Sequence, residues 1–204
     1  MALLFSKILE EAALKNKVKY GSKEMKQFLR DKALQATSRN VKPQKIINTK
    51  KAAANIQELV MPGRMVCYFY DPKTKDKLPY WDKFPVVFPI EHYSDGFLGL
   101  NMHYLPPQYR ALLMDKLYSL LNNKRYDATT KLKINYQILS AAAKFKFFKP
   151  CLKRYLYSHV KSQIVQIESA EWEYVAFLPL ARFQKSTNMK VWRDSVAMLK
   201  EGNK

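Results

Sequence analysis

The hydrophobic pattern divides the chain into helical ends and a middle that is rich in β-forming residues. Apolar residues recur at helical spacing over residues 4–13 and again over residues 25–36. Ser22 is placed to cap the second of these helices, with Glu24 in its first turn. The pattern therefore predicts two helices before residue 37.

The segment that follows, residues 37–51, is polar and basic and contains Pro43. We expect an extended arm here, followed by a short helix over residues 51–59. The basic residues of the arm either follow a nucleic-acid backbone, lie on a neighbouring protein, or belong to a plain flexible linker. These residues are Arg39, Lys42, Lys45, Lys50 and Lys51.

The middle of the chain has runs of β-forming residues separated by turn residues. Pro85 and Pro89 lack a backbone donor, so the run that contains them is expected at a sheet edge. Ser94, Asp95 and Gly96 mark a turn, with a positive φ expected at Gly96. Short strands joined by hairpins predict a small antiparallel β-barrel-like unit, either a partly open barrel or a curled sheet. The expected strands are residues 64–70, 84–90, 97–104 and 163–168.

Helical spacing returns after residue 105, and Pro150 is placed as the first residue of one of the helices. The predicted fold class is α+β, with the β-unit flanked by basic helices. Two regions are expected: residues 1–60 hold the N-terminal helices and basic arm, and residues 61–204 hold the β-unit with the C-terminal helices. The expected C-terminal helices are residues 106–121, 130–148, 150–160, 169–178 and 186–200.

Composition adds a strong charge imbalance to this picture. Hydrophobic residues make up 48% of the 204 residues, which is enough for a core and excludes wholesale disorder. The 36 Lys and Arg outnumber the 17 Asp and Glu, for a formal net charge of +19. Such an excess is best tolerated beside a polyanion: nucleic acid, an acidic membrane face or an acidic protein. No stretch is apolar enough to span a bilayer, and the N-terminus lacks the features of a signal peptide. Cys67 and Cys151 lie too far apart in sequence to suggest a disulfide framework, so a reducing compartment is expected.

The basic residues cluster between residues 124 and 161, where Asp127 is the one acidic residue. Lysine and arginine neutralise phosphates and release counterions, so a nucleic-acid backbone is the first candidate ligand. The alternative is a solvated helix face, and the interleaved aromatic residues either stack on bases or fill a core. The candidate nucleic-acid-binding residues are Lys124, Arg125, Lys131, Lys133, Lys144, Lys146, Lys149, Lys153, Arg154 and Lys161.

Catalytic and metal-binding motifs are absent from the sequence. The three histidines do not have metal-ligand spacing, and His103 is interpreted as a hydrogen-bonded, structural residue at a strand end. Glycine loops for phosphate and nucleophile elbows are missing, so we expect neither an enzyme nor a cofactor. A nuclease-like set of carboxylates with a lysine is attributed to chance; it would comprise Asp71, Asp76, Asp82 and Lys83.

Residues 78–106 combine bulky aromatics, prolines and two glycines. Gly96 and Gly99 allow a turn and a close approach of backbones, and Pro106 ends the segment. We interpret these three residues as structural.

The same region carries a family resemblance. The segment YFYDPKTKDKLPYWDKFPVVFPIEHYSDGFLGLNMHYLPPQYR, residues 68–110, resembles the DNA end protector family of contractile-tailed phages, as does ESAEWEYVAFLPLARFQK, residues 168–185. The resemblance implies a minor virion protein that binds the packaged DNA end near the portal and shields it from exonuclease. It would occur in the virion, and in the host cytoplasm during assembly, without a membrane partner.

The partners implied are the genomic DNA end and other virion proteins of the portal, neck or baseplate. The alternative is a structural component of the neck or baseplate that acts through protein–protein contacts, with the same lysines on acidic neighbours.

Overall fold

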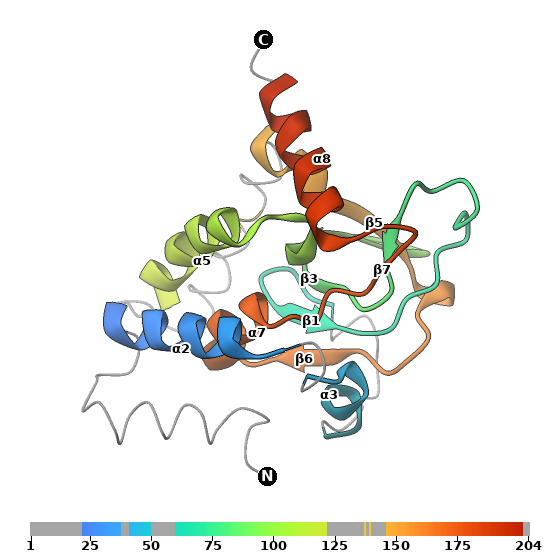
Figure 1. The fold of residues 1–204 in the computed structure, drawn as a ribbon. Helices are drawn as coiled ribbons and strands as arrows, with labels where there is room; N and C mark the ends of the chain where they lie inside the picture. Colours follow the sequence, from blue (N-terminus) through green and yellow to red (C-terminus); the bar gives the residue numbers. More distant parts are fainter. Residues whose placement is uncertain are drawn as a thin grey trace.

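A five-stranded antiparallel sheet forms the centre of the molecule, with helices packed around it (Figure 1). The computed structural model describes residues 22–37, 41–49, 60–121, 137, 139 and 146–201. In spatial order the sheet contains β5 (Leu152–Leu156), β4 (Gly96–Asn101), β3 (Val86–Tyr93), β1 (Met65–Cys67) and β6 (Val165–Ile167). A separate two-stranded ribbon pairs β2 (Trp81–Asp82) with β7 (Phe183–Gln184).

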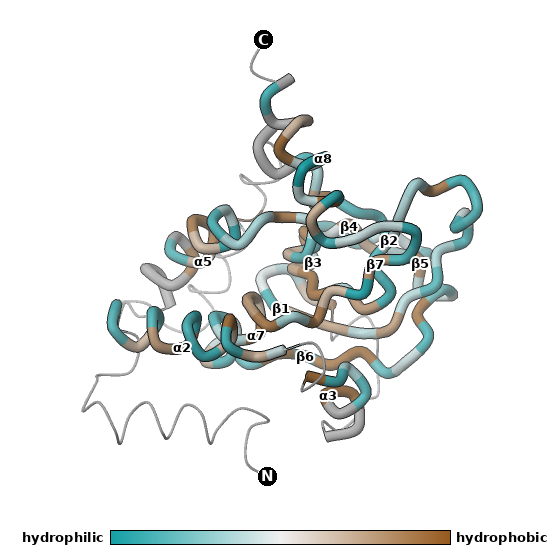
Figure 2. The backbone as a smooth tube through the Cα atoms, in the orientation of Figure 1, coloured by the Kyte–Doolittle hydropathy of each residue, from teal (hydrophilic) through white to brown (hydrophobic). Residues whose placement is uncertain are grey.

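The two faces of the sheet bury two different sets of side chains. One face carries Cys67, Phe88 and Leu100 into the main core, against the helices. The other face carries an aromatic cluster that includes Tyr68 and Phe97. Figure 2 shows apolar segments along β6 and α7, whereas the outer turns of α2 are hydrophilic. The helices are α2 (Lys23–Gln35), α3 (Pro43–Thr49), α5 (Pro107–Leu121), α7 (Trp172–Phe177) and α8 (Asn188–Glu201).

Helix α2 begins where the sequence predicts, at the Ser22 cap. The Ser22 hydroxyl accepts a hydrogen bond from the Met25 backbone N–H at 3.2 Å, which satisfies one of the open donors of the first turn. Met25 and Leu29 are buried in the main core. On the same helix, Arg30 pairs with the buried Glu173 of α7, so the helix is fixed by an ion pair as well as by apolar packing.

Several other predictions are confirmed. A two-residue turn at Ser94–Asp95 joins β3 to β4, and β6 adds the later strand to β1. Helices α5 and α7 begin and end close to the expected bounds. The backbone carbonyl of Pro106 accepts from the N–H groups of Tyr109 and Arg110, so Pro106 stands at the start of α5. None of the described helices is both long and apolar enough to cross a bilayer.

The position of β3 corrects the expectation drawn from its prolines. β3 lies between β4 and β1, in the middle of the sheet rather than at an edge. β1 pairs with only Val86 and Val87 of β3. No strand therefore requires a backbone N–H from Pro89 on that side. On the β4 side the register shifts between Pro89 and Glu91. A bulge is one of the places where a sheet tolerates proline.

Two predicted segments have a different structure. Residues 43–49 of the expected extended arm form helix α3, because Pro43 is tolerated in the first turn of a helix. The expected helix at 150–160 is wrong: Pro150 lies inside a short 3₁₀ helix, η2 (Lys146–Cys151), and the strand β5 follows. β5 forms because its residues pair with β4, a long-range contact that the local sequence does not encode.

The barrel-like unit is an open sheet, because β5 and β6 are its two edges among the described residues. The expected helices at 4–13 and 51–59, and most of the one at 130–148, lie outside the part of the chain that the structure describes.

The two glycines of the hairpin lie where backbones approach each other. A Cβ at Gly96 would overlap the carbonyl oxygen of Tyr155 on β5, and one at Gly99 would overlap Val87 on β3. The expected positive φ at Gly96 is wrong: among the described glycines, Gly63 has that conformation. Gly96 is therefore required by the neighbouring strand and not by the turn.

Candidate nucleic-acid interface

The structure places four of the ten candidate basic side chains. Lys149 and Lys161 are exposed to solvent, and Lys153 and Arg154 lie on the edge strand β5. Lys146 lies in η2, but its side chain is outside the description. Lys124, Arg125, Lys131, Lys133 and Lys144 also lie outside the described residues.

The two basic residues of β5 point to opposite faces of the sheet, as successive residues of a strand do. Arg154 pairs with the exposed carboxylate of Asp95 and lies 4.0 Å from the ring centre of Tyr93. Its charge is therefore partly neutralised within the molecule. Lys153 belongs to the other face, with its strand partner Gly99.

Lys153 is largely withdrawn from solvent. Its ammonium lies 4.2 Å from the centre of the Tyr104 ring, a cation–π distance. Tyr104 belongs to the 3₁₀ helix η1 (Met102–Tyr104), which follows β4. Burial lowers the pKa of Lys153, because the charged form has lost part of its hydration.

Lys153 lines a cavity of about 390 Å³ on this side of the molecule. The cavity walls come from β5, from β2, from Tyr104 and from the loop that joins β1 to β2. Five of the fourteen lining residues are aromatic, and three are basic: Lys73, Lys153 and Arg154. Its charged and aromatic wall residues include Lys73, Tyr80, Trp81, Asp82, Tyr104 and Lys153.

A lysine from another part of the chain holds the loop that forms one wall. The Lys185 ammonium donates to the backbone carbonyls of Lys75 at 2.9 Å and Asp76 at 3.3 Å. Lys185 adopts a positive φ of 60°, an uncommon conformation for a residue other than glycine. The ammonium also lies 5.5 Å from the ring centre of Trp81.

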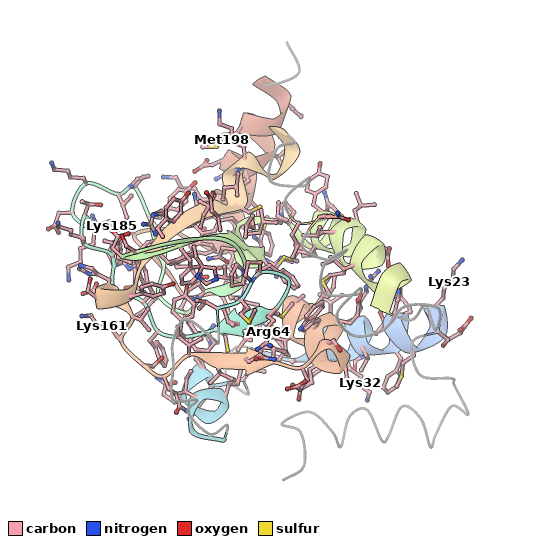
Figure 3. All side chains as sticks on the ribbon, turned by 180° about the vertical axis from the view of Figure 1, so that it is seen from behind. Lys23, Lys32, Arg64, Lys161, Lys185 and Met198 are labelled. Atoms are coloured by element: carbon pink, nitrogen blue, oxygen red, sulfur yellow. The ribbon has the colours of Figure 1, made fainter. Side chains whose placement is uncertain are left out.

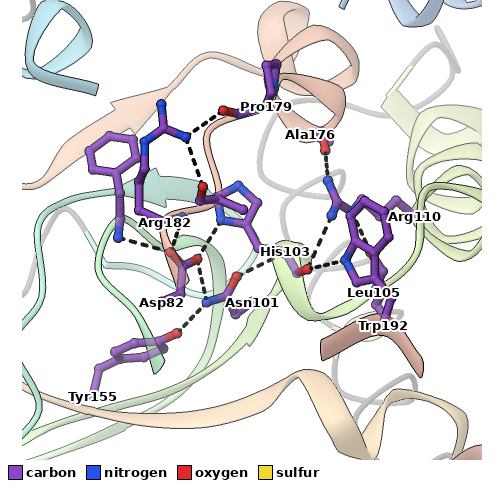
Figure 4. Close-up of polar contacts among 12 residues, drawn as sticks. Asp82, Asn101, His103, Leu105, Arg110, Tyr155, Ala176, Pro179, Arg182 and Trp192 are labelled. Carbon is purple, nitrogen blue, oxygen red and sulfur yellow. Dashed lines mark hydrogen bonds and ion pairs between the residues drawn. The ribbon is translucent and has the colours of Figure 1, made fainter. Parts of the chain in front are cut away.

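A buried polar network lies behind the cavity (Figure 4). His103 Nδ1 and Asp82 Oδ2 are 2.5 Å apart, and both side chains are fully buried. Asp82 also accepts from the backbone N–H of Arg182, and Asn101 donates to both Asp82 and the Tyr155 hydroxyl. This confirms the structural, hydrogen-bonded role expected for His103.

The charge state of this pair follows from burial and hydrogen bonding. Burial by itself would raise the pKa of Asp82, but His103 and the backbone donors outweigh it and lower that pKa. Burial lowers the pKa of His103, and the attraction of Asp82 only partly offsets it. The arrangement is therefore a carboxylate that accepts from the Nδ1–H of a neutral imidazole, with Nε2 buried and without a partner among the described residues.

A buried arginine joins η1 to the helices. Arg110 of α5 donates to the backbone carbonyls of Leu105 at 2.7 Å and Ala176 at 2.9 Å. The Trp192 indole of α8 donates to the His103 carbonyl at 2.9 Å. Burial lowers the pKa of Arg110 to about 10, so the guanidinium stays charged at neutral pH. These contacts fix Tyr104, and with it the cavity floor, on a rigid frame.

The arrangement can bind an anion and a flat ring, and nothing described suggests bond-breaking chemistry. Among residues 22–37, 41–49, 60–121 and 146–201, no cluster of His, Cys, Asp or Glu suits a metal ion. Two members of the nuclease-like set have internal roles: Asp82 bonds His103, and Asp71 pairs with Lys75 at 3.1 Å.

Sequence reasoning missed the aromatic wall as a possible site. Tyr80 and Tyr104 belong to the segment that was interpreted as structural, and Lys153 was placed on a helix. Lys153 and Tyr155 lie two residues apart, so in a strand they share one face of the sheet. This face can be recognised only when β5 is known to be a strand paired with β4.

One family model matches the chain. It is described as the phage T4 terminal DNA protecting protein, and it matches residues 10–195. The match includes residues 68–110 and 168–185, and it confirms the resemblance that these segments carry. No curated protein and no solved structure matches the chain.

Proposed function

The chain belongs to the family of the phage T4 terminal DNA protecting protein, and on this premise we propose that it is a minor virion protein that binds the packaged DNA end. It binds the end without sequence preference and shields it near the portal. It acts by binding and not by catalysis. The family match over residues 10–195 is the observation that carries this proposal.

The charge of the molecule supports the proposed ligand. The formal net charge is +19, and acidic side chains of the described part are drawn into internal pairs. Asp95 pairs with Arg154, and Asp115 pairs with Arg30 at 2.8 Å. The remaining positive charge favours phosphates, and phosphate contacts carry no sequence information.

The first test is protection of a blunt linear duplex against a processive exonuclease. We expect the protein to slow digestion at 50 mM salt. If six to ten phosphates are contacted, its affinity for the duplex should fall by about three to five orders of magnitude between 50 and 200 mM salt. Unimpeded digestion by the exonuclease, or an affinity that ignores salt, would contradict the proposal.

A double charge-reversal variant tests whether the exposed candidate lysines take part in DNA binding. Replacing Lys149 and Lys161 with Glu should weaken protection, because both side chains are exposed in the candidate interface. The matched control reverses Lys23 on α2 and Lys190 on α8, which are also exposed but lie outside the candidate set. Figure 3 shows Lys161 and Lys23 on opposite sides of the molecule. Normal protection by the Lys149 and Lys161 variant, together with failed particle assembly, would favour a structural role in the neck or baseplate.

A further inference from the structure

We propose that the cavity beside Lys153 receives the terminal nucleotide of a DNA strand, unpaired from its complement, with a phosphate at the Lys153 ammonium and the base against the tyrosine rings. This inference rests on the proposed function and adds to it a binding site for the end itself. A site of this kind distinguishes a strand end from continuous duplex, which a basic surface alone does not do.

The Lys153 ammonium is the group that would bind the phosphate. The Lys153 ammonium contacts the Tyr104 ring, and the described residues offer it no carboxylate partner. A cation that has lost hydration without gaining an ion pair favours an incoming anion, since a charge-assisted hydrogen bond would replace the lost water. Burial lowers the pKa of Lys153, and a bound phosphate would raise it again.

Aromatic rings beside the ammonium would bind the base. The rings of Tyr80 and Tyr104 have centres 6.1 Å apart and planes inclined at 36°. Tyr80 is only half-buried, whereas Tyr104 is 5% exposed, so Tyr80 is the ring more open to a base. Phe183 packs edge-on against both rings and supports them from the ribbon. Every base has a flat π-face, so a tyrosine platform binds bases with little preference among them.

The size and charge of the cavity suit a nucleotide. Its volume of about 390 Å³ lies within the usual range for small-molecule sites. Lys73 and Arg154 also carry positive charge at the wall, and Arg154 is paired with Asp95. Asp82 is the acidic wall residue, but its oxygens are already engaged by His103 and by backbone N–H groups.

The walls are held in place before any ligand binds. Lys185 fixes the loop at Lys75 and Asp76, and the loop is tied at its start by Asp71 and His159, whose backbones are joined by a 3.1 Å hydrogen bond. Such preorganisation reduces the ordering cost that a ligand must overcome.

The closing experiment is photo-crosslinking with 5-iododeoxyuridine, which couples to an aromatic ring on which it stacks. The label replaces the terminal thymidine of one strand in a linear duplex, and a second duplex carries it well inside. We expect the terminal label to crosslink to a peptide that contains Tyr80 or Tyr104, and the internal label not to do so. Exonuclease protection is measured on the same samples.

Two variants with matched controls extend the test. Lys153→Met keeps an unbranched side chain of nearly the same length and removes its charge. It should weaken binding to the end about tenfold, whereas Lys23→Met should change it less than about twofold. Tyr80→Leu should reduce the crosslink at least about fivefold, whereas Tyr93→Leu, a ring outside the cavity, should not. Melting temperatures confirm that each variant folds.

The outcomes separate the two proposals. Protection without a crosslink in this cavity overturns the inference and leaves the proposed function standing. A crosslink from free 5-iododeoxyuridine monophosphate at these tyrosines, with none from the terminal label, overturns it as well, because the ligand is then a mononucleotide. If the protein neither binds nor protects ends, the proposed function fails and the inference fails with it.

Discussion

Gly96 and His103 show how single positions are set by neighbours distant in sequence. At Gly96 the backbone of β5 leaves no space for a side chain. At His103 a carboxylate 21 residues away in sequence fixes one ring nitrogen, and burial keeps the imidazole neutral. Both residues are structural, and each gives a prediction.

The first prediction concerns Gly96→Ala. The new Cβ would overlap the Tyr155 carbonyl oxygen, so β4 and β5 must separate or shift. We expect the free energy of unfolding to fall by about 1–3 kcal/mol in urea titrations. Ser94→Ala, in the exposed turn of the same hairpin, is the control and should change it by less than about 0.5 kcal/mol. Equal stability of the two variants would show that the strands do not lie this close.

The second prediction concerns pH. The folded-state pKa of His103 lies below its ordinary value of 6.5. As the pH falls, the unfolded chain therefore takes up a proton on this histidine at a higher pH than the folded chain does. Stability contributed by the neutral imidazole is complete above pH 6.5 and is lost on acidification towards the lower folded-state pKa. One proton gives a slope of at most about 1.4 kcal/mol per pH unit.

His103→Asn keeps a donor for Asp82 and removes the titration. Urea titrations of both proteins between pH 7 and pH 5 should therefore show a smaller loss of stability in the variant. Parallel curves for the two proteins would mean that folding does not shift the pKa of His103, and a smaller loss in the wild type than in the variant would mean that folding raises it. His92 and His159 remain in both proteins, so their contribution cancels in the comparison.

At the scale of elements, the sequence predicts those helix ends and turns that depend on residues close together in the chain. The Ser22 cap, the start of α5 at Pro106 and the turn at Ser94–Asp95 follow from side-chain chemistry within a few residues. β5 and the central place of β3 depend on pairing with strands far along the chain. The cavity cannot be predicted from the sequence either, because Lys153 and Tyr104 come into contact only when β5 pairs with the sheet.

The third prediction tests the loop between β1 and β2. Lys185→Met removes the donor that holds the carbonyls of Lys75 and Asp76, so the loop should open more often. We expect backbone hydrogen exchange over residues 71–80 to become about tenfold faster or more, while exchange in β3 and β4 stays unchanged. Lys23→Met is the control. Unchanged exchange in the loop would show that Lys185 does not position the cavity wall.

At the scale of the whole molecule, a large positive charge is combined with an open sheet, a buried polar network and, among the described residues, a concave aromatic site beside the edge strand β5. The proposed attraction to any duplex rests on this charge, and the proposed preference for a terminus rests on the cavity. The family and its DNA-protecting role follow from residues 68–110 and 168–185 in the sequence, and the family match covers residues 10–195. Which groups meet the DNA depends on the folded arrangement.

The most direct measurement of the central claim is the saturation of linear duplexes of increasing length, at the highest salt concentration at which the protein still slows the exonuclease, with a covalently closed circle as the reference. If the protein recognises ends, the number of molecules bound per linear duplex stays constant as its length grows, and the circle binds far fewer. If the number bound rises in proportion to length, and the circle binds as many as the linear form, the protein does not recognise DNA ends.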